Sequence, residues 1–203
     1  MSLELMQYLP DPAEAGAQGA RKYSGAVAQG YDDKREQSPK WQVEQQVIEG
    51  MLNEFMFGSW ILDCPCGTGR FFEFYHKKGF LFRGVDASAD MLALAAQKIR
   101  DPMKARLAQG DIRSLPLDDK SVDASVAVRI TRWLSPEDCQ VMIRELQRVT
   151  RKKIIFTARV ANHPHARPLE IFIPELEGWN ITANVQGYEP AYRIVELRPD
   201  VVP

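Results

Sequence analysis

Cysteine is scarce in this sequence, with three residues among 203. Two of them form Cys64-Pro65-Cys66, and no second pair of cysteines or histidines with the spacing of metal ligands follows. Three cysteines do not build a disulfide framework either. We therefore expect no metal site and interpret Cys64 and Cys66 as small residues in a buried junction between a strand and a loop.

Long apolar runs and an excess of charge of one sign are also missing. No run is long enough to span a bilayer, and no secretory signal sequence is visible. Lys and Arg number 26 against 27 Asp and Glu, which gives a net charge of −1. A dedicated binder of nucleic acid or of an acidic membrane has a more basic surface. We expect a cytoplasmic protein without a nucleic-acid or membrane partner.

The most informative segment is a glycine turn that follows a short apolar run. Residues 60–69 read Trp-Ile-Leu-Asp-Cys-Pro-Cys-Gly-Thr-Gly, and a helix-like segment, residues 70–78, comes next. Gly67 and Gly69 allow a tight turn and a close approach between the backbone and a ligand. This pattern predicts a docking point for a nucleotide-type ligand.

Two further apolar runs end in acids. Residues 81–86 end at Asp86, seventeen positions after Gly69, and residues 105–112 contain Asp111 after a third predicted strand. A carboxylate at a strand end accepts hydrogen bonds from both hydroxyls of a ribose. Three acids at strand ends around one glycine turn favour an adenosine site.

On these residues the chain resembles the class I S-adenosylmethionine-dependent methyltransferases, in particular the small-molecule group that includes enzymes of ubiquinone and menaquinone biosynthesis. The resemblance covers about residues 23–160. The first motif of that family, acid-x-Gly-x-Gly-x-Gly, is matched by Asp63, Gly67 and Gly69, with Pro65 at the place of the first glycine. A φ compatible with proline keeps the turn at that point.

The resemblance implies S-adenosylmethionine as cofactor and S-adenosylhomocysteine as product. It places Asp63 near the methionine part, Asp86 on the ribose, and Asp111 with Ile112 at the adenine. The full set of cofactor-binding residues that we predict is Asp63, Cys64, Pro65, Cys66, Gly67, Thr68, Gly69, Asp86, Ala87, Met91, Gly110, Asp111, Ile112 and Arg129.

A nicotinamide-dependent enzyme is the main rival interpretation, because it also needs a glycine turn and a distant acid. Its motif has a third glycine three residues after the second, where this chain has Phe72. We expect Phe72 to crowd the close contact between helix and strand that the third glycine permits. The methyltransferase interpretation is therefore favoured.

The order of the predicted elements indicates the fold. Strands are expected at residues 105–109, 122–130 and 153–158, with a helix after a Ser88 N-cap and another after Ser135-Pro136. Alternation of strands and helices implies a doubly wound parallel sheet. Residues 180–186 and 192–197 flank the turn 187–190, which predicts an antiparallel C-terminal hairpin. The α/β, Rossmann-like fold with seven strands, the last inserted beside the fifth, follows from the resemblance.

We divide the chain into a tail and one domain. Residues 1–22, rich in Ala, Gly and Pro, form the tail, and residues 23–203 form a single methyltransferase domain. Within it we expect a helical cap (23–58), a cofactor-binding core (59–160), a short lid loop (161–179) and the C-terminal hairpin (180–198).

Candidates for contact with the methyl acceptor come from three segments. The N-terminal segment offers Tyr23, Tyr31, Arg35 and Trp41. The end of the fourth strand offers Arg129, Arg132 and Trp133, and the lid loop offers His163, His165 and Arg167. Arginine suits a carboxylate or phosphate on the acceptor, and histidine suits proton removal near neutral pH. Tyr31, Arg129, Trp133 and His163 are the candidates for catalytic residues, although each also has an ordinary structural interpretation.

The favoured function is methyl transfer to a small molecule that bears an anionic group. Displacement at a sulfonium needs positioning more than it needs a catalytic dyad, so the lack of an obvious dyad does not exclude an enzyme. The Asn/Asp-Pro-Pro-aromatic run of base-modifying methyltransferases does not occur after the fourth strand. A protein or nucleic-acid acceptor, and a regulatory protein that binds S-adenosylmethionine without transferring its methyl group, remain as alternatives.

Overall fold

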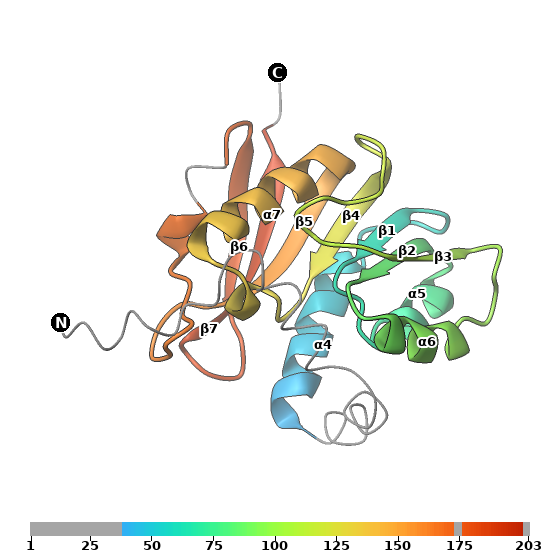
Figure 1. The fold of residues 1–203 in the computed structure, drawn as a ribbon, viewed down its shortest axis with the longest axis horizontal. Coiled ribbons are helices and arrows are strands. Elements are labelled where there is room, and N and C mark those ends of the chain that lie inside the picture. Colours follow the sequence, from blue (N-terminus) through green and yellow to red (C-terminus); the bar gives the residue numbers. More distant parts are fainter. Residues whose placement is uncertain (1–37, 173–175, 201–203) are drawn as a thin grey trace.

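A computed structural model describes residues 38–172 and 176–200. Within these residues, seven strands form one sheet in the order β3-β2-β1-β4-β5-β7-β6 (Figure 1). The strands are β1 (Trp60–Asp63), β2 (Leu81–Asp86), β3 (Ala105–Gln109), β4 (Val122–Ala127), β5 (Thr150–Arg159), β6 (Trp179–Gln186) and β7 (Tyr192–Pro199).

The first five strands pair in parallel with one another, and β7 is antiparallel to both β5 and β6. The α/β fold class, the seven-stranded and mostly parallel sheet, and the antiparallel C-terminal hairpin are thus confirmed. The strand order reverses between β1 and β4. In a doubly wound sheet this is where a crevice opens at the carboxyl ends of the strands.

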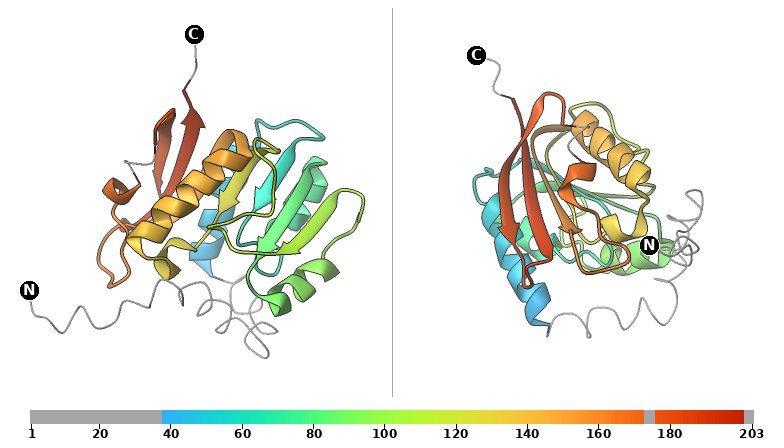
Figure 2. Two further views of the ribbon diagram at one scale, coloured as in Figure 1. Left: turned by 45° about the horizontal axis from the view of Figure 1, so that its top comes forward. Right: turned by 90° about the vertical axis from the view of Figure 1, so that its left-hand side faces the viewer.

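Helices cover both faces of the sheet, as the two views of Figure 2 show with α4 and α7 on opposite sides. One apolar cluster packs α4, α5 and α6 against one face, and a second cluster packs α7 against the other. The helices are α4 (Pro39–Leu52), α5 (Phe72–Lys78), α6 (Ala89–Gln97) and α7 (Pro136–Val149), with single 3-10 turns at η2 (Thr131–Trp133) and η3 (Leu169–Ile171). No helix in the described part of the chain has the length and apolar character needed to cross a bilayer.

Helix α7 begins as its sequence predicts. Ser135 precedes Pro136, and the Ser135 hydroxyl accepts a hydrogen bond from the Asp138 amide at 3.0 Å. Cys139, Ile143, Leu146 and Val149 are buried on one side of this helix. A serine cap with proline at the first helical position is the common start of such a helix.

The fourth strand is shorter than expected. We predicted residues 122–130, but β4 ends at Ala127. Arg129 adopts a positive φ of 62°, and its amide donates to the Thr157 hydroxyl at 2.8 Å instead of a strand partner. The chain leaves the sheet there because its backbone turns away before Ile130.

Phe72 does not crowd the contact between α5 and the sheet. A side-chain atom added at Gly84 of β2 would lie 3.0 Å from the end of the Phe72 ring. The missing side chain at Gly84 makes room for Phe72, which packs against Phe82 with ring centres 4.6 Å apart. The expected steric conflict was wrong because a glycine on the strand replaces the one lacking on the helix.

Several predicted segments lie outside the described residues. These are the tail 1–22, residues 23–37 of the helical cap, which include Tyr23, Tyr31 and Arg35, and residues 173–175 of the lid loop. The described part of the cap contains α4. The division of the chain into domains stays a prediction.

Candidate functional site

The described residues enclose a cavity of about 340 Å³ at the carboxyl ends of β1, β2 and β4. Its wall includes all but one of the predicted cofactor-binding residues. These are Asp63, Cys64, Pro65, Cys66, Gly67, Thr68, Asp86, Ala87, Met91, Gly110, Asp111, Ile112 and Arg129. Gly69 is not part of this wall, because it turns the chain behind it and faces the Phe72 ring.

The turn after β1 is held by backbone hydrogen bonds to the neighbouring strands. The Cys64 amide donates to Val126 at 3.0 Å and the Cys66 amide donates to Val85 at 2.9 Å. The peptide bond between Cys64 and Pro65 is cis, and Gly67 and Gly69 have φ values of 54° and 78°. Glycine adopts such values without steric cost.

Gly67 leaves open space in the cavity. A side-chain atom added there would meet no protein atom within 4 Å. At Gly67, which lines the cavity, the backbone itself therefore borders open space.

Asp86 closes the turn from the next strand. Its Oδ2 accepts from the Gly67 amide at 2.8 Å and its Oδ1 accepts from the Ser88 amide at 2.9 Å. Burial raises the pKa of Asp86 above its usual value, and the hydrogen bonds from Ser88 and Gly67 oppose the rise. Each oxygen keeps a second lone pair, which suits a ligand that offers two hydroxyl donors.

Asp111 is bound by a neighbouring arginine. The Arg113 Nε lies 3.0 Å from Asp111 Oδ1, and an Arg113 terminal nitrogen lies 2.6 Å from Oδ2. Burial raises the pKa of Asp111, but the hydrogen bonds from Arg113 outweigh it and lower the value overall. This carboxylate is therefore ionised and fixed at the cavity wall.

Asp63 is deeply buried, with 1% of its surface exposed. Its pKa is raised to about 8, mainly by burial; the charge of Asp86 contributes to the rise, and Arg70 and Tyr75 oppose it. Its Oδ2 has no hydrogen-bond partner among the described residues. A buried carboxyl oxygen without a partner beside a cavity is suited to bind a donor group of a ligand.

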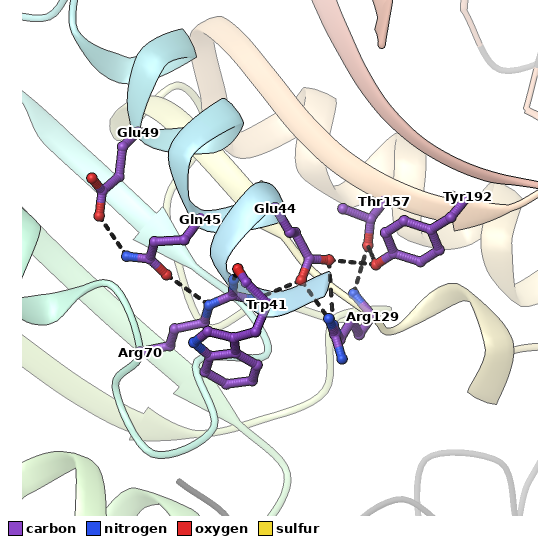
Figure 3. A network of polar contacts seen from close by, with 8 residues as sticks. All are labelled: Trp41, Glu44, Gln45, Glu49, Arg70, Arg129, Thr157 and Tyr192. Atoms are coloured by element: carbon purple, nitrogen blue, oxygen red, sulfur yellow. Dashed lines mark hydrogen bonds and ion pairs between the residues drawn. The ribbon is translucent and has the colours of Figure 1, made fainter. Parts of the chain in front are cut away.

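A polar cluster that the sequence did not reveal joins Glu44 to four residues of the wall, Arg70, Arg129, Thr157 and Tyr192 (Figure 3). Glu44, on α4, is 1% exposed and pairs with Arg70 at 2.7 Å and Arg129 at 2.8 Å. The Tyr192 hydroxyl donates to Glu44 at 2.5 Å and lies 2.8 Å from the Thr157 hydroxyl. Arg129, which we expected to contact the ligand, is thus held by a structural acid.

One signal in the sequence marks this cluster. Trp41, Glu44, Ile48 and Leu52 are the buried residues of α4, with the spacing of one helix face. Glu44 is the acid on that otherwise apolar stripe. An acid at a core position needs a buried partner, although the stripe does not identify Arg70 and Arg129 as the partners.

The remaining acceptor candidates have different surroundings. Trp133, His163 and the exposed Arg132 line the cavity, and burial together with Arg132 and Arg159 lowers the pKa of His163. His165 is not part of the wall. Arg167 is buried and donates to the Leu134 carbonyl at 2.9 Å, so its role is structural.

Three further cations line the cavity wall. Lys40, Arg132 and Arg159 line it, together with Tyr188 and Glu189. Glu189 pairs with Lys40 at 2.9 Å and with Arg159 at 2.5 Å. No group of three or more potential metal ligands occurs within residues 38–172 and 176–200.

Comparison with protein families identifies part of the chain. Residues 61–153 match the family model described as a methyltransferase domain. This match contains the glycine turn, Asp86 and Asp111.

Curated relatives match a stretch of similar length. A malonyl-[acyl-carrier protein] O-methyltransferase of Hamiltonella defensa is 37% identical over 93 residues, which are 46% of this chain and 34% of the relative. The corresponding protein of Pectobacterium atrosepticum is 34% identical over 94 residues, 46% of this chain and 35% of the relative. The chain thus spans about a third of the length of these relatives.

Solved structures share the fold over a longer range. Magnesium protoporphyrin IX methyltransferase of Synechocystis, solved with bound S-adenosylhomocysteine, superposes with a TM-score of 0.71. The match covers 93% of this chain and 98% of that chain at 16% sequence identity. At this identity the comparison establishes the fold.

Proposed function

We propose that this chain, which carries a class I S-adenosylmethionine-dependent methyltransferase domain over residues 61–153, is an enzyme that methylates a small-molecule acceptor. The observation that carries the proposal is the convergence of Asp63, Gly67, Asp86 and Asp111 on one cavity at the reversal of strand order. Their carboxyl groups and the glycine backbone supply acceptors suited to the hydroxyl and amino groups of S-adenosylmethionine.

In this proposal each acid holds one part of the cofactor. Asp86 accepts hydrogen bonds from the ribose hydroxyls, and Asp111 with Ile112 binds the adenine. The unpaired Oδ2 of Asp63 accepts from the amino group of the methionine part. The bound cofactor supplies a methyl group on a positively charged sulfur, which is already activated for displacement. The protein contributes by positioning the acceptor and excluding water.

We further propose that the acceptor carries an anionic group. Lys40, Arg132 and Arg159 give the cavity wall a positive charge that Glu189 offsets only in part. The sequence offered Arg129 and Arg132 as ligands of this anionic group. Because Arg129 is paired with Glu44, Arg132 is the better suited of the two. A carboxylate acceptor such as the malonyl group in the names of the relatives belongs to this class.

A histidine in the cavity wall can accept a proton from the acceptor. His163 lines the cavity, and its lowered pKa keeps the ring neutral near pH 7, so that it can accept a proton. A carboxylate acceptor needs no such step because it arrives ionised. Cys64, Cys66 and Cys139 are unpaired, which a reducing compartment favours, and a cytoplasmic location is part of the proposal.

Calorimetry with S-adenosylmethionine, S-adenosylhomocysteine and NADH tests the cofactor assignment. We expect binding of the first two and none of NADH, and the reverse result would contradict it. A transfer assay with methyl-labelled donor against small carboxylates, phosphates and neutral hydroxyl compounds then tests the enzyme. Binding without transfer to any acceptor would favour the regulatory alternative.

A further inference from the structure

Glu44 brings two arginines from distant parts of the chain to the cavity wall. Its carboxylate contacts Arg70, which follows the glycine turn, and Arg129, which follows β4 (Figure 3). The Arg70 guanidinium carbon lies 3.8 Å from the centre of the Trp41 ring, and that of Arg129 lies 5.5 Å from it. Both guanidinium groups therefore occupy one small region beside the indole.

Two cations in so small a region require a counter-charge. Arg70 is 8% exposed in its side chain and Arg129 is 25% exposed, so water screens their repulsion only partly. The charge of Arg129 disfavours the charged form of Arg70, and that of Glu44 favours it. With Glu44 in place, the two arginines and the acid carry a net charge of about +1.

This charge acts on the part of the cavity near the glycine turn. Arg70, Arg129 and Asp63 line the same cavity, and the field of Arg70 acts on the Asp63 carboxyl. S-adenosylmethionine has a positive sulfur, whereas S-adenosylhomocysteine has a neutral one. The relative affinity for the two compounds therefore reports the electrostatic potential in the cavity.

We propose that Glu44 is a positioning residue that acts through Arg70 and Arg129 and lowers the positive potential of the cavity, so that a cationic donor can bind. The proposal rests on the proposed function, because it requires S-adenosylmethionine to occupy this cavity. Glu44 itself contacts neither donor nor acceptor. It neutralises one of two charges that the cofactor would otherwise meet.

The test compares dissociation constants for S-adenosylmethionine and S-adenosylhomocysteine by calorimetry in the wild type and in Glu44→Gln. We expect the ratio of the first constant to the second to rise roughly three- to tenfold, since one extra charge beside the cavity acts through a medium of intermediate dielectric. A loss of packing alone would weaken the binding of both compounds to the same extent and leave the ratio unchanged.

Two control variants separate charge from structure. Tyr192→Phe removes a hydrogen bond to Glu44 without changing the charge, so the ratio should stay within about twofold of the wild type. Glu73→Gln makes the same change of charge on α5, where Glu73 is 66% exposed and pairs with Arg100. Its ratio should also stay near the wild-type value because water screens an exposed charge.

Removal of a cation gives the opposite result. Arg129→Met lowers the local charge by one, so the ratio should fall, and the double variant Glu44→Gln/Arg129→Met should return near the wild-type ratio. Arg129→Met also keeps the test decisive if Glu44→Gln does not fold. An unchanged ratio in folded Glu44→Gln or Arg129→Met overturns the inference, whereas a wild type that binds neither compound overturns the proposed function.

Discussion

The Gly67 amide donates a hydrogen bond to Asp86 Oδ2 at 2.8 Å, which joins the turn after β1 to the carboxylate that ends β2. Asp86 thus stabilises the turn and also lines the cavity. Asp86 also fixes the start of the next helix through the Ser88 amide. The position of the predicted ribose ligand is therefore set by the same contacts that stabilise the loop.

Replacement of Asp86 by alanine should weaken S-adenosylhomocysteine binding about ten- to a hundredfold, because a hydrogen bond to a charged group contributes about 1.5–3 kcal/mol. Calorimetry measures the affinity, and circular dichroism checks the fold. Asp86→Asn keeps one carbonyl acceptor and should have a smaller effect. Equal affinities of the folded alanine variant and the wild type would exclude Asp86 from the site.

A valine at Gly67 should abolish cofactor binding, because its side chain would occupy open space on the cavity wall. Gly58 is a matched control: it has a φ of 82°, similar open space and no place in the cavity. Gly58→Val carries the same backbone strain and should lower the melting temperature without changing the dissociation constant. Loss of binding in both variants would mean that strain alone is responsible.

The Asp63 carboxyl should make stability fall as the pH rises. Its pKa is 3.8 when exposed and about 8 in the folded protein, so the folded state binds the extra proton between these values. The free energy of unfolding therefore loses up to about 1.4 kcal/mol per pH unit across this window. Below pH 3.8 the group is protonated in both states and contributes its full stability.

Asp63→Asn isolates this effect from other titrating groups. Urea unfolding at pH 5, 7 and 8.5 should show that the difference in stability between variant and wild type shifts in favour of the variant as the pH increases. Parallel stability curves for the two proteins would show that Asp63 is ionised in the folded state.

Arg132→Ala should raise the KM for an anionic acceptor by up to about fivefold, as expected for an exposed ion pair worth about 1 kcal/mol or less. The affinity for the cofactor should not change. Arg106→Ala, at an exposed position on β3 outside the cavity, is the control and should leave both values unchanged. If Arg132→Ala raises the KM for a neutral acceptor as much as the KM for the anionic one, Arg132 does not recognise the anion.

The sequence was sufficient to predict the alternation of strands and helices and the glycine turn, because both depend on local patterns, whereas the seven-stranded order came from the resemblance. Apolar runs that end in acids and alternate with capped helices specify a parallel sheet, and Gly67 and Gly69 mark the turn before any contact is known. The boundaries were less predictable. The point at which β4 ends, Ala127, is one example. Two residues later, the Arg129 amide donates to the hydroxyl of Thr157, which lies on β5, and no local pattern announces this contact.

The role of Arg129 was decided by tertiary structure alone. From the sequence it suited an anionic acceptor and a structural acid equally well, and the fold brings Glu44 to it from 85 positions earlier in the chain. Such pairing depends on how α4 docks against the carboxyl ends of the strands, which no local pattern encodes. The sequence therefore determined which groups are present at the site, and packing over long distances decided which of them neutralise one another and which face the cavity.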